Sequence, residues 1–434
     1  MLEPLMRFIV FLAALATVFP VVNAQEIESG IDTAAAEVQP QVVEWRRWFH
    51  QNPELSNREQ GTGQRIAEIL DELGIPHETG IAGYGVVGMI RGGKPGPLVA
   101  IRADMDGLPV TEQTGLPFAS TVTTEFNGQQ TGVMHACGHD NHMAMALGAA
   151  KILNDNREDL AGSVMLIFQP AEEGPPPGEP GGSLLMLEEG IFDEATPEAV
   201  FGIHVGIGVP GGEFATRSGP LMASANRFLI TVHGKQTHGA RPWDGIDPIT
   251  VAAQIIMGLQ TVASRQVDVT RAPSIVSVGR IDGGIRNNVI PDTVELEGTI
   301  RAFDNEMREQ IIEAVERTAT SIAAASNATI DFEVDRGAPP VVNTDRLYTM
   351  MKPVLERASG APVASVTPQT VAEDFSEFGQ VTDSLFVFLG SGPEGVDPTT
   401  LPANHSPEFN MEEEWLETGV KAFVDMVVTY LGDE

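Results

Sequence analysis

Short apolar runs alternate with amphipathic stretches along the first half of the chain. Apolar residues recur at helical spacing in residues 37–49, 60–73 and 143–153. Brief apolar runs of strand-like length, bounded by turn residues, lie at residues 86–90, 98–102, 164–168 and 200–204. This alternation is typical of a sheet that is flanked by helices, so the pattern predicts an α/β fold.

The pattern changes between about residues 211 and 335. Strand-like alternation predicts an antiparallel sheet at residues 227–232, 274–278 and 294–300. Residues 248–263 and 306–325 have the spacing of amphipathic helices. This part of the chain therefore reads as a compact α+β unit.

The last hundred residues return to the first pattern, with an apolar strand at residues 385–389 and a closing helix at residues 412–431. We therefore expect the α+β unit to be inserted into the α/β domain. A chain of 434 residues also exceeds the ~250–300 residues at which single cores stop growing. We place the large domain at residues 25–212 and 333–434, and the inserted unit at residues 213–332.

Composition excludes one broad class of function. The chain has 26 basic and 60 acidic residues, a formal net charge of -34. Such a charge repels a phosphate backbone or an anionic membrane surface. We therefore expect no nucleic-acid partner.

The N-terminus has the pattern of an export signal. Residues 8–22 are apolar except for Thr17 and Pro20, and Val22-Asn23-Ala24 fits a small-x-small cleavage site. We expect a signal peptide at residues 1–24, and export of the chain to a periplasmic or secreted location. The alternative is a membrane anchor, although the run is shorter than the ~20 residues that a span needs. No later run is long enough, so we expect no membrane span after cleavage.

A dense group of metal-binding side chains precedes the predicted helix at 143–153. The run His135-Ala-Cys137-Gly-His139-Asp140-Asn-His142 places a thiol, three imidazoles and a carboxylate within eight residues. Hydrophobic packing gives no reason for that density. Thiolate, imidazole and carboxylate together suit zinc, manganese, cobalt or nickel. Cys137 is the only cysteine, so it cannot form an intramolecular disulfide, and metal ligation accounts for it.

A second group of carboxylates follows the apolar run at 164–168. Glu172 and Glu173 repel each other as neighbours, and a cation beside them removes that penalty. One can bind metal while the other faces water, takes its proton and delivers it to a leaving amine. The proline- and glycine-rich residues 174–182 that follow predict a loop beside the site.

Nine motifs in order resemble those of one family. They are WRRWFHQNPELS, RADMDGLP, HACGHD, FQPAEEG, GIHV, GKQTHGARPWDGIDP, GGIRNNVIPD, EDFS and NHSPEF. They resemble the aminoacylase and carboxypeptidase G superfamily of dinuclear metallohydrolases, within it the amidohydrolase branch of hippurate hydrolases and plant auxin-conjugate hydrolases. The resemblance spans nearly all of the chain after residue 24.

The resemblance implies two divalent metal ions, zinc, manganese, cobalt or nickel, and a set of ligands. These ligands are Cys137, His139, Glu173, His204 and His405, with the thiolate bridging the two ions. Glu172 is implied as the general base and acid. Asp104 stands where related peptidases carry a metal-binding histidine, and Asp106 resembles an aspartate that orients a ligand.

The resemblance also implies roles for the inserted unit, as a lid and as the contact of a homodimer. His238 is implied to reach an active site, often that of the partner subunit, and to stabilise the oxyanion. Asn288 resembles a residue that holds the substrate carboxylate or the oxyanion.

We therefore expect a metal-dependent amidohydrolase that cleaves N-acyl amino acids or related small amides. The first alternative is a metallo-dipeptidase or carboxypeptidase, because the sequence does not reveal the pocket lining that separates the two. The second is a binding protein that has kept the fold and lost catalysis. Such a protein should lack a ligand or the base, whereas all six positions are filled here.

Overall fold

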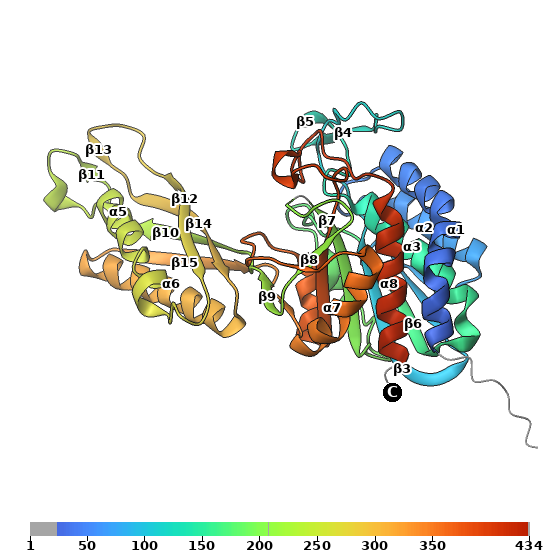
Figure 1. The fold of residues 1–434 in the computed structure, drawn as a ribbon. Helices are drawn as coiled ribbons and strands as arrows, with labels where there is room; N and C mark the ends of the chain where they lie inside the picture. The colour runs from blue at the N-terminus through green and yellow to red at the C-terminus, as the bar shows by residue number, and fades with distance from the viewer. Residues whose placement is uncertain (1–23, 207, 433–434) are drawn as a thin grey trace, which may run out of the picture.

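The protein has two lobes of unequal size joined by a narrow connection (Figure 1). The structure, a computed structural model, describes residues 24–206 and 208–432. The predicted signal peptide therefore lies outside the described residues, except for Ala24. No helix of the described part is long and apolar enough to cross a membrane. The predicted α/β fold with a second, smaller α+β domain is confirmed.

The larger lobe is built on an eight-stranded mixed sheet. In spatial order its strands are β1 (His77–Ile81), β2 (Gly85–Arg91), β6 (Ala161–Gln169), β3 (Lys94–Asp104), β7 (Ala199–Gly206), β18 (Asp383–Gly390), β8 (Phe214–Thr216) and β17 (Ala364–Ser365). The four central strands β6, β3, β7 and β18 run parallel to one another. Their carboxyl ends therefore meet at one edge of the sheet.

Helices cover one face of this sheet. They are α1 (Ala24–Gln51), α2 (Gln60–Leu73), α3 (His139–Asp155), α7 (Asp345–Ser359) and α8 (Trp415–Gly432). The central helix α3 packs against α1, α8 and β3, and it is buried along nearly its whole length. Val99 and Ile101 of β3 point into this layer.

The opposite face carries a thinner cover. Ala100 of β3 points there, towards Phe375 and Phe378 in the short helical segment η4 (Asp374–Gln380). Helix α4 (Gly182–Glu188) and the pair β9 (Gly219–Met222) and β16 (Val341–Asn343) complete this layer. Both faces of the central strands are therefore buried, which explains why their sequences are continuous apolar runs.

The smaller lobe, which we call the lid, has its own core. Its antiparallel sheet has the order β12 (Ser274–Asp282), β14 (Thr293–Ala302), β10 (Asn226–His233) and β15 (Thr329–Arg336). Helices α5 (Pro248–Leu259) and α6 (Asn305–Ala325) pack on one face of it. Asp247 and Asp304 cap these helices by accepting hydrogen bonds from backbone N–H groups of the first turns.

The lid begins and ends later than the limits of 213 and 332 that the sequence suggests. Strand β8 lies beyond residue 213 yet pairs with β18 in the large sheet, and β15 continues the lid sheet to Arg336. We therefore place the lid at residues 226–336. The physical reason is that strand pairing across the chain, and not a change of local pattern, decides the domain to which each strand belongs.

Each lobe also carries a small two-stranded ribbon. In the lid, β11 (Thr237–His238) pairs with β13 (Val289–Ile290). In the large lobe, β4 (Thr123–Phe126) pairs with β5 (Gln129–Gly132). Figure 1 places β11 and β13 at the end of the lid farthest from the large lobe.

Candidate metal centre

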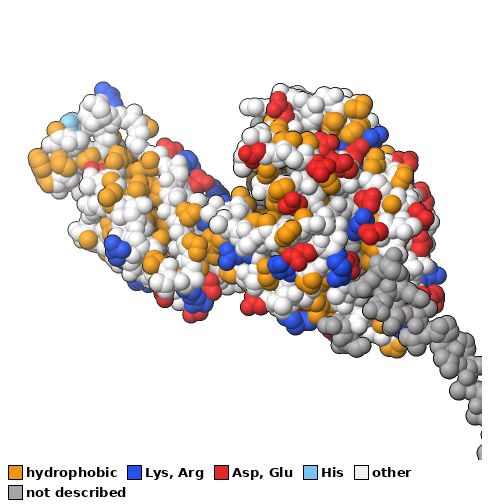
Figure 2. Space-filling model, viewed as in Figure 1, with side chains coloured by type: hydrophobic (Ala, Val, Ile, Leu, Met, Phe, Trp, Pro, Cys, Tyr) orange, Lys and Arg blue, Asp and Glu red, His pale blue; other side chains and the backbone are white. Residues whose placement is uncertain are grey.

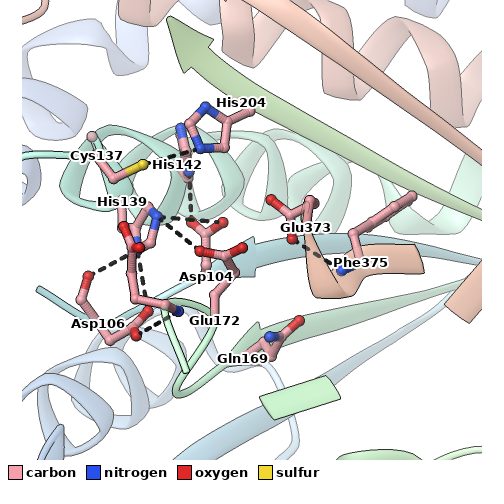
Figure 3. Close-up of polar contacts among 12 residues, drawn as sticks. Asp104, Asp106, Cys137, His139, His142, Gln169, Glu172, His204, Glu373 and Phe375 are labelled. Carbon is pink, nitrogen blue, oxygen red and sulfur yellow. Dashed lines mark hydrogen bonds and ion pairs between the residues drawn. The ribbon is translucent and has the colours of Figure 1, made fainter. Parts of the chain in front are cut away.

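The candidate metal centre lies at the carboxyl edge of the parallel strands. Strand β3 ends at Asp104, β7 carries His204 next to its end, and Glu172 follows the end of β6. Helix α3 begins at His139 and directs its N-terminus to the same place. Figure 3 shows these side chains converging from strands and helix on one centre. This is the position at which open α/β sheets bind their ligands.

The five predicted ligands form two overlapping donor groups. Cys137, His139 and His204 bring one ligand atom each within 4.8 Å of one another, and so do Cys137, Glu173 and His405. The Cys137 Sγ atom lies 3.4 Å from His204 Nε2. The two groups share Cys137, so its sulfur would be within reach of a metal ion held by either group.

Gly138 allows Cys137 and His139 to face the same centre. Its φ angle is +97°, in the left-handed region that favours glycine. A Cβ atom there would lie 2.3 Å from Val205 Cγ2. Both the backbone angle and the lack of space for a side chain therefore favour glycine at the turn before α3.

The chemistry of the donors fits a divalent ion. His139 Nδ1 donates to the Asp106 carbonyl oxygen at 2.8 Å, so the lone pair of the neutral ring is on Nε2. Among the described residues, this buried Nε2 has no hydrogen-bond partner. A buried nitrogen without a partner is costly, and a metal ion removes the cost. Sulfur, imidazole nitrogen and carboxylate oxygen together suit zinc and its neighbours.

His405 reaches the centre from the loop that follows β18. Its backbone N–H donates to the Ala136 carbonyl at 2.8 Å, and its Nε2 lies 3.2 Å from Glu173 Oε1. The ring is about half exposed, with 55% of the side chain accessible. The adjacent Asn404 donates to the carbonyls of Cys137 and Val205, at 3.0 and 3.1 Å. Asn404 therefore holds this loop against the segment that contains Cys137 and against the end of β7, which carries His204.

Glu172 lies beside the donor groups and is largely buried. Its Oε2 atom is 3.8 Å from His139 Nε2. Burial and the negative charges of Glu373 and Glu173 raise the pKa of Glu172 well above its usual range. A carboxyl with a raised pKa is suited to take a proton from water and release it to an amine.

The centre as a whole carries an excess of negative charge. Burial raises the pKa of the Cys137 thiol, and the carboxylates of Glu173 and Glu172 raise it further. Burial lowers the pKa of His139, but the charges of Asp104 and Asp106 outweigh this and raise it to about 10. A divalent cation reverses both effects, because it stabilises the thiolate and displaces the imidazole proton.

Asp104 and Asp106 both lie beside His139, with a carboxylate oxygen 3.8 and 3.2 Å from its ring nitrogens. Asp106 accepts from Ser56 Oγ at 2.6 Å and from the backbone N–H of Glu173 at 3.0 Å, and so positions one ligand while its carbonyl positions His139. Asp104 accepts from His142 Nδ1 at 2.5 Å. His142 belongs to the run at residues 135–142 but not to the implied ligands, and its Nε2 accepts from the Val205 N–H at 2.8 Å, which links Asp104 to β7.

An arginine that the sequence did not single out holds several carboxylates behind the centre. Arg102 is buried and donates to Asp104 at 2.6 Å, to Glu373 at 2.8 Å and to Asp374 at 3.1 Å. Gln169 accepts from the same guanidinium at 2.8 Å. Glu373 and Asp374 belong to the EDFS motif, so the family motif was the one signal that could have found them.

His238 and Asn288 are not brought to the centre of their own chain. Both lie at the β11–β13 ribbon, where Gly239 N–H donates to the Asn288 carbonyl at 2.8 Å (Figure 1). His238 Nδ1 accepts from Ala240 N–H at 3.0 Å, so the neutral ring carries its proton on the other nitrogen. That Nε2 is a hydrogen-bond donor at the outer end of the lid.

A cavity of about 630 Å³ opens from the centre towards the connection between the lobes. Glu172, Glu173 and Glu373 line its inner end, and residues 174–179 of the proline-rich loop form one wall, as the sequence predicts. Residues 335–338, at which the chain passes from the lid back to the large lobe, line the same cavity. The cavity has room for a small substrate that reaches the centre.

The large lobe has thiol, imidazole and carboxylate donors at the carboxyl edge of its parallel central strands, and the lid is inserted into its chain. These features define the class as two-domain α/β metalloproteins. Comparison with protein families gives the family. Residues 100–429 match Peptidase family M20/M25/M40, and the chain belongs to this family. The resemblance that the nine motifs indicate is thereby confirmed.

Two enzymes and one solved structure are similar to this chain over most of its length. It is 39% identical over 396 residues to Thermostable carboxypeptidase 2 of Saccharolobus solfataricus, covering 91% of this chain and 96% of that protein. It is 38% identical over 376 residues to N-acetyl-L-cysteine deacetylase of Bacillus subtilis, covering 87% and 85%. The crystal structure of Bacillus subtilis YXEP, described as a dinuclear metal-binding peptidase of the M20 family, matches with a TM-score of 0.77 and 35% identity, covering 92% and 99%.

Proposed function

We propose that this protein is a metal-dependent amidohydrolase that cleaves the amide bond of N-acyl amino acids or related small amides. The observation that carries the proposal is the pair of donor groups that share Cys137, with Glu172 beside them. The related deacetylase and the dinuclear metal-binding structure support both the reaction and the number of ions. We propose zinc, manganese, cobalt or nickel as the metal.

The residues divide the chemistry among them. Cys137, His139, Glu173, His204 and His405 would hold two divalent ions, which when bound would supply an activated water and polarise the scissile carbonyl. Glu172 takes a proton from the attacking water and gives it to the departing amine. Asp106 keeps His139 and Glu173 oriented.

We further propose a homodimer in which His238 of each lid serves the site of the other chain. The support is its place at the outer end of the lid, far from its own centre (Figure 1). His238 Nε2 would donate to the developing oxyanion, and Asn288 would hold the oxyanion or the substrate carboxylate. The lid would also exclude water when it closes.

We also propose export, with residues 1–24 removed as a signal peptide. The support is the apolar run of residues 8–22 and the small-x-small site that ends at Ala24. The N-terminal sequence of protein recovered from the medium or the periplasm tests it. A mature chain that still begins at Met1 would contradict the proposal.

Hydrolysis of a panel of N-acyl amino acids tests the reaction. The wild-type protein and Glu172→Gln are stripped of metal and reloaded in turn with zinc, manganese, cobalt and nickel. We expect metal-dependent turnover in the wild type and a loss of at least about 100-fold in the variant, the low end of what general acid–base catalysis supplies. Full metal loading without turnover of any substrate would favour the binding-protein alternative.

A peptidase is the second candidate, and the related carboxypeptidase favours it. Unblocked dipeptides and N-blocked peptides in the same panel distinguish the two reactions. A preference for acyl amino acids, measured as kcat/KM, supports the amidohydrolase. A preference for peptides would replace it.

A further inference from the structure

The outer end of the lid carries large apolar side chains in water. Trp243 is 74% exposed and Ile285 is fully exposed, at 101%. Ile249 lies beside the same loop, because a Cβ atom on Gly284 would be 3.4 Å from its Cδ1. Figure 2 shows hydrophobic side chains gathered at this end of the lid. Such patches on soluble proteins mark contact sites.

The turn that carries Trp243 is well fixed. It is the short helical turn η2 (Pro242–Asp244), in which Arg241 and Asp244 form an ion pair at 2.8 Å. At its base, Lys235 and Ile246 exchange two backbone hydrogen bonds, of 2.9 and 3.1 Å. The indole is therefore presented on a rigid support, which lowers the entropy that a contact would cost.

The charges of this end complement the mouth of the metal centre. Lys235 and Arg286 are exposed at the tip, and Arg241 is exposed there in its ion pair with Asp244. The cavity at the metal centre is lined by seven acidic residues and by Arg336 as its one lysine or arginine among the described residues. Opposite charges of this kind favour approach of the lid tip of one chain to the cavity of another.

The tip lies at the end of the lid farthest from the large lobe, which holds the metal centre of the same chain (Figure 1). The apolar residues share the tip with His238 and Asn288, since Gly239 N–H binds the Asn288 carbonyl. A tip that delivers His238 to a second chain also delivers Trp243 and Ile285 there. This step rests on the proposed function and on the proposed dimer.

We propose that Trp243, with Ile285, forms an apolar wall for the acyl group at the metal centre of the partner subunit. Seven of the residues that line that cavity are acidic, and among the described residues it has no aromatic side chain to offer an acyl group a flat apolar surface. An indole face from the partner supplies it, because aromatic side chains present a large rigid surface for stacking and apolar contact. Trp243 is then a specificity residue that acts between chains.

The first experiment compares two substrates that differ only in the acyl group. N-benzoyl and N-acetyl forms of the same amino acid are used with the wild type, Trp243→Ala and Ile285→Ala. We expect the benzoyl-to-acetyl ratio of kcat/KM to fall about tenfold in Trp243→Ala, as removal of apolar contacts in a pocket does. Met257→Ala is the control, because Met257 is 71% exposed on α5 outside these loops, and it should leave the ratio unchanged.

The second experiment asks in which chain Trp243 acts. Differently tagged Glu172→Gln and Trp243→Ala chains are expressed together, and the heterodimer is isolated. Its one site with an intact Glu172 faces the Trp243 of the other chain if the wall acts between subunits. We expect the benzoyl-to-acetyl ratio of kcat/KM to be the same for this heterodimer as for the wild type.

Each contrary outcome has a separate meaning. An unchanged or raised ratio in Trp243→Ala overturns the wall, and a heterodimer that keeps the low ratio overturns its action between subunits. A wild type that sediments as a monomer while it turns over both substrates overturns it as well. A wild type that turns over neither substrate instead overturns the proposed function.

Discussion

At the scale of single residues, Gly138 decides whether Cys137 and His139 can face one centre. Gly138→Ala adds the strain of a positive φ and a methyl group 2.3 Å from Val205 Cγ2. Gly74→Ala is the matched control, because Gly74 has a φ of +69° and open space around its Cβ position. We expect the control to cost about 1 kcal/mol in the free energy of unfolding and Gly138→Ala to cost about 1–3 kcal/mol more.

Urea unfolding and metal content measure this difference. Gly138→Ala should also bind less metal, since both flanking ligands shift, whereas Gly74→Ala should bind as much as the wild type. Equal losses of stability in the two variants, with full metal content, would show that the turn at α3 tolerates a side chain.

We predict that Asp106 positions two of the proposed metal ligands. It contacts His139 through its carbonyl and Glu173 through its carboxylate. Asp106→Asn should weaken metal binding about 10- to 100-fold, the usual effect of losing a residue that orients ligands. A competition titration against a chelator measures it. Asp155→Asn is the control at an exposed ion pair, and a loss of affinity there as large as in Asp106→Asn would refute a specific role.

The site residues that could be predicted from the residue types alone stand together in short polar runs. Cys137, His139 and Glu172 stand in dense polar runs that packing does not explain. Arg102 could not be found in this way, because it sits inside an apolar strand and its partner Glu373 is 271 positions away. Contacts between distant positions depend on the fold, which local pattern does not contain.

At the scale of elements, apolar periodicity predicted which segments form helices and strands but not where they end. Strand β3 was expected at residues 98–102 and runs over Lys94–Asp104, because pairing with β6 and β7 extends it. Helix α7 was not predicted from the sequence. It contains Pro353 and many polar residues, and only a narrow face of the helix is buried. Pairing and burial supply what propensity leaves out.

A contact between α1 and α3 predicts that the free energy of unfolding depends on pH. His50 of α1 lies between two buried carboxylates, with Nδ1 2.8 Å from Asp140 Oδ2 of α3 and Nε2 3.0 Å from Glu112 Oε1. Burial lowers the pKa of His50, but the charge of Asp140 and the hydrogen bonds to both carboxylates outweigh it, so the pKa is raised. The folded protein therefore binds this proton more tightly than the unfolded chain does.

The sign of the effect follows from that raised pKa. The stabilisation by His50 is complete below the unfolded value of about 6.5 and is lost as the pH rises through the higher folded pKa. His50→Gln should cost about 3 kcal/mol at pH 6, as loss of one partner of a buried pair does, and less at each higher pH. Urea unfolding at several pH values measures it.

His233→Gln is the control for this series. His233 forms its ion pair with Asp331 on the surface of the lid, with 38% of its side chain exposed. An exposed pair contributes roughly 0–1 kcal/mol, so this variant should change little at any pH. A cost of His50→Gln that grows as the pH rises would contradict a protonated His50 in the fold.

At the scale of the whole molecule, the sequence predicted two domains and an insertion but not their arrangement. The lid has a core of its own around Phe228 and Ile311, separate from the cores of the large lobe. It joins the large lobe through the two chain segments on either side of residues 226–336. Its tip consequently lies far from the metal centre, which no local pattern in the sequence could have indicated (Figure 1).

This arrangement predicts that metal stabilises one lobe only. All five proposed ligands lie in the large lobe, and the lid keeps its core without them. Binding to the folded state adds about 2.7 kcal/mol when free metal is 100 times its Kd. Calorimetry should therefore show two unfolding transitions, of which metal removal lowers the Tm of one.

Tryptophan fluorescence assigns the transitions, because Trp243 alone of the four tryptophans lies in the lid. In a Trp243→Phe variant the remaining tryptophans report on the large lobe, and their transition should be the one that shifts with the chelator. If calorimetry showed a single transition that metal removal shifts as a whole, the lobes would unfold as one cooperative unit. The lid would then depend on the metal centre through contacts between the lobes, such as the hydrogen bond from Asn305 of α6 to Gln380 of η4 at 2.6 Å.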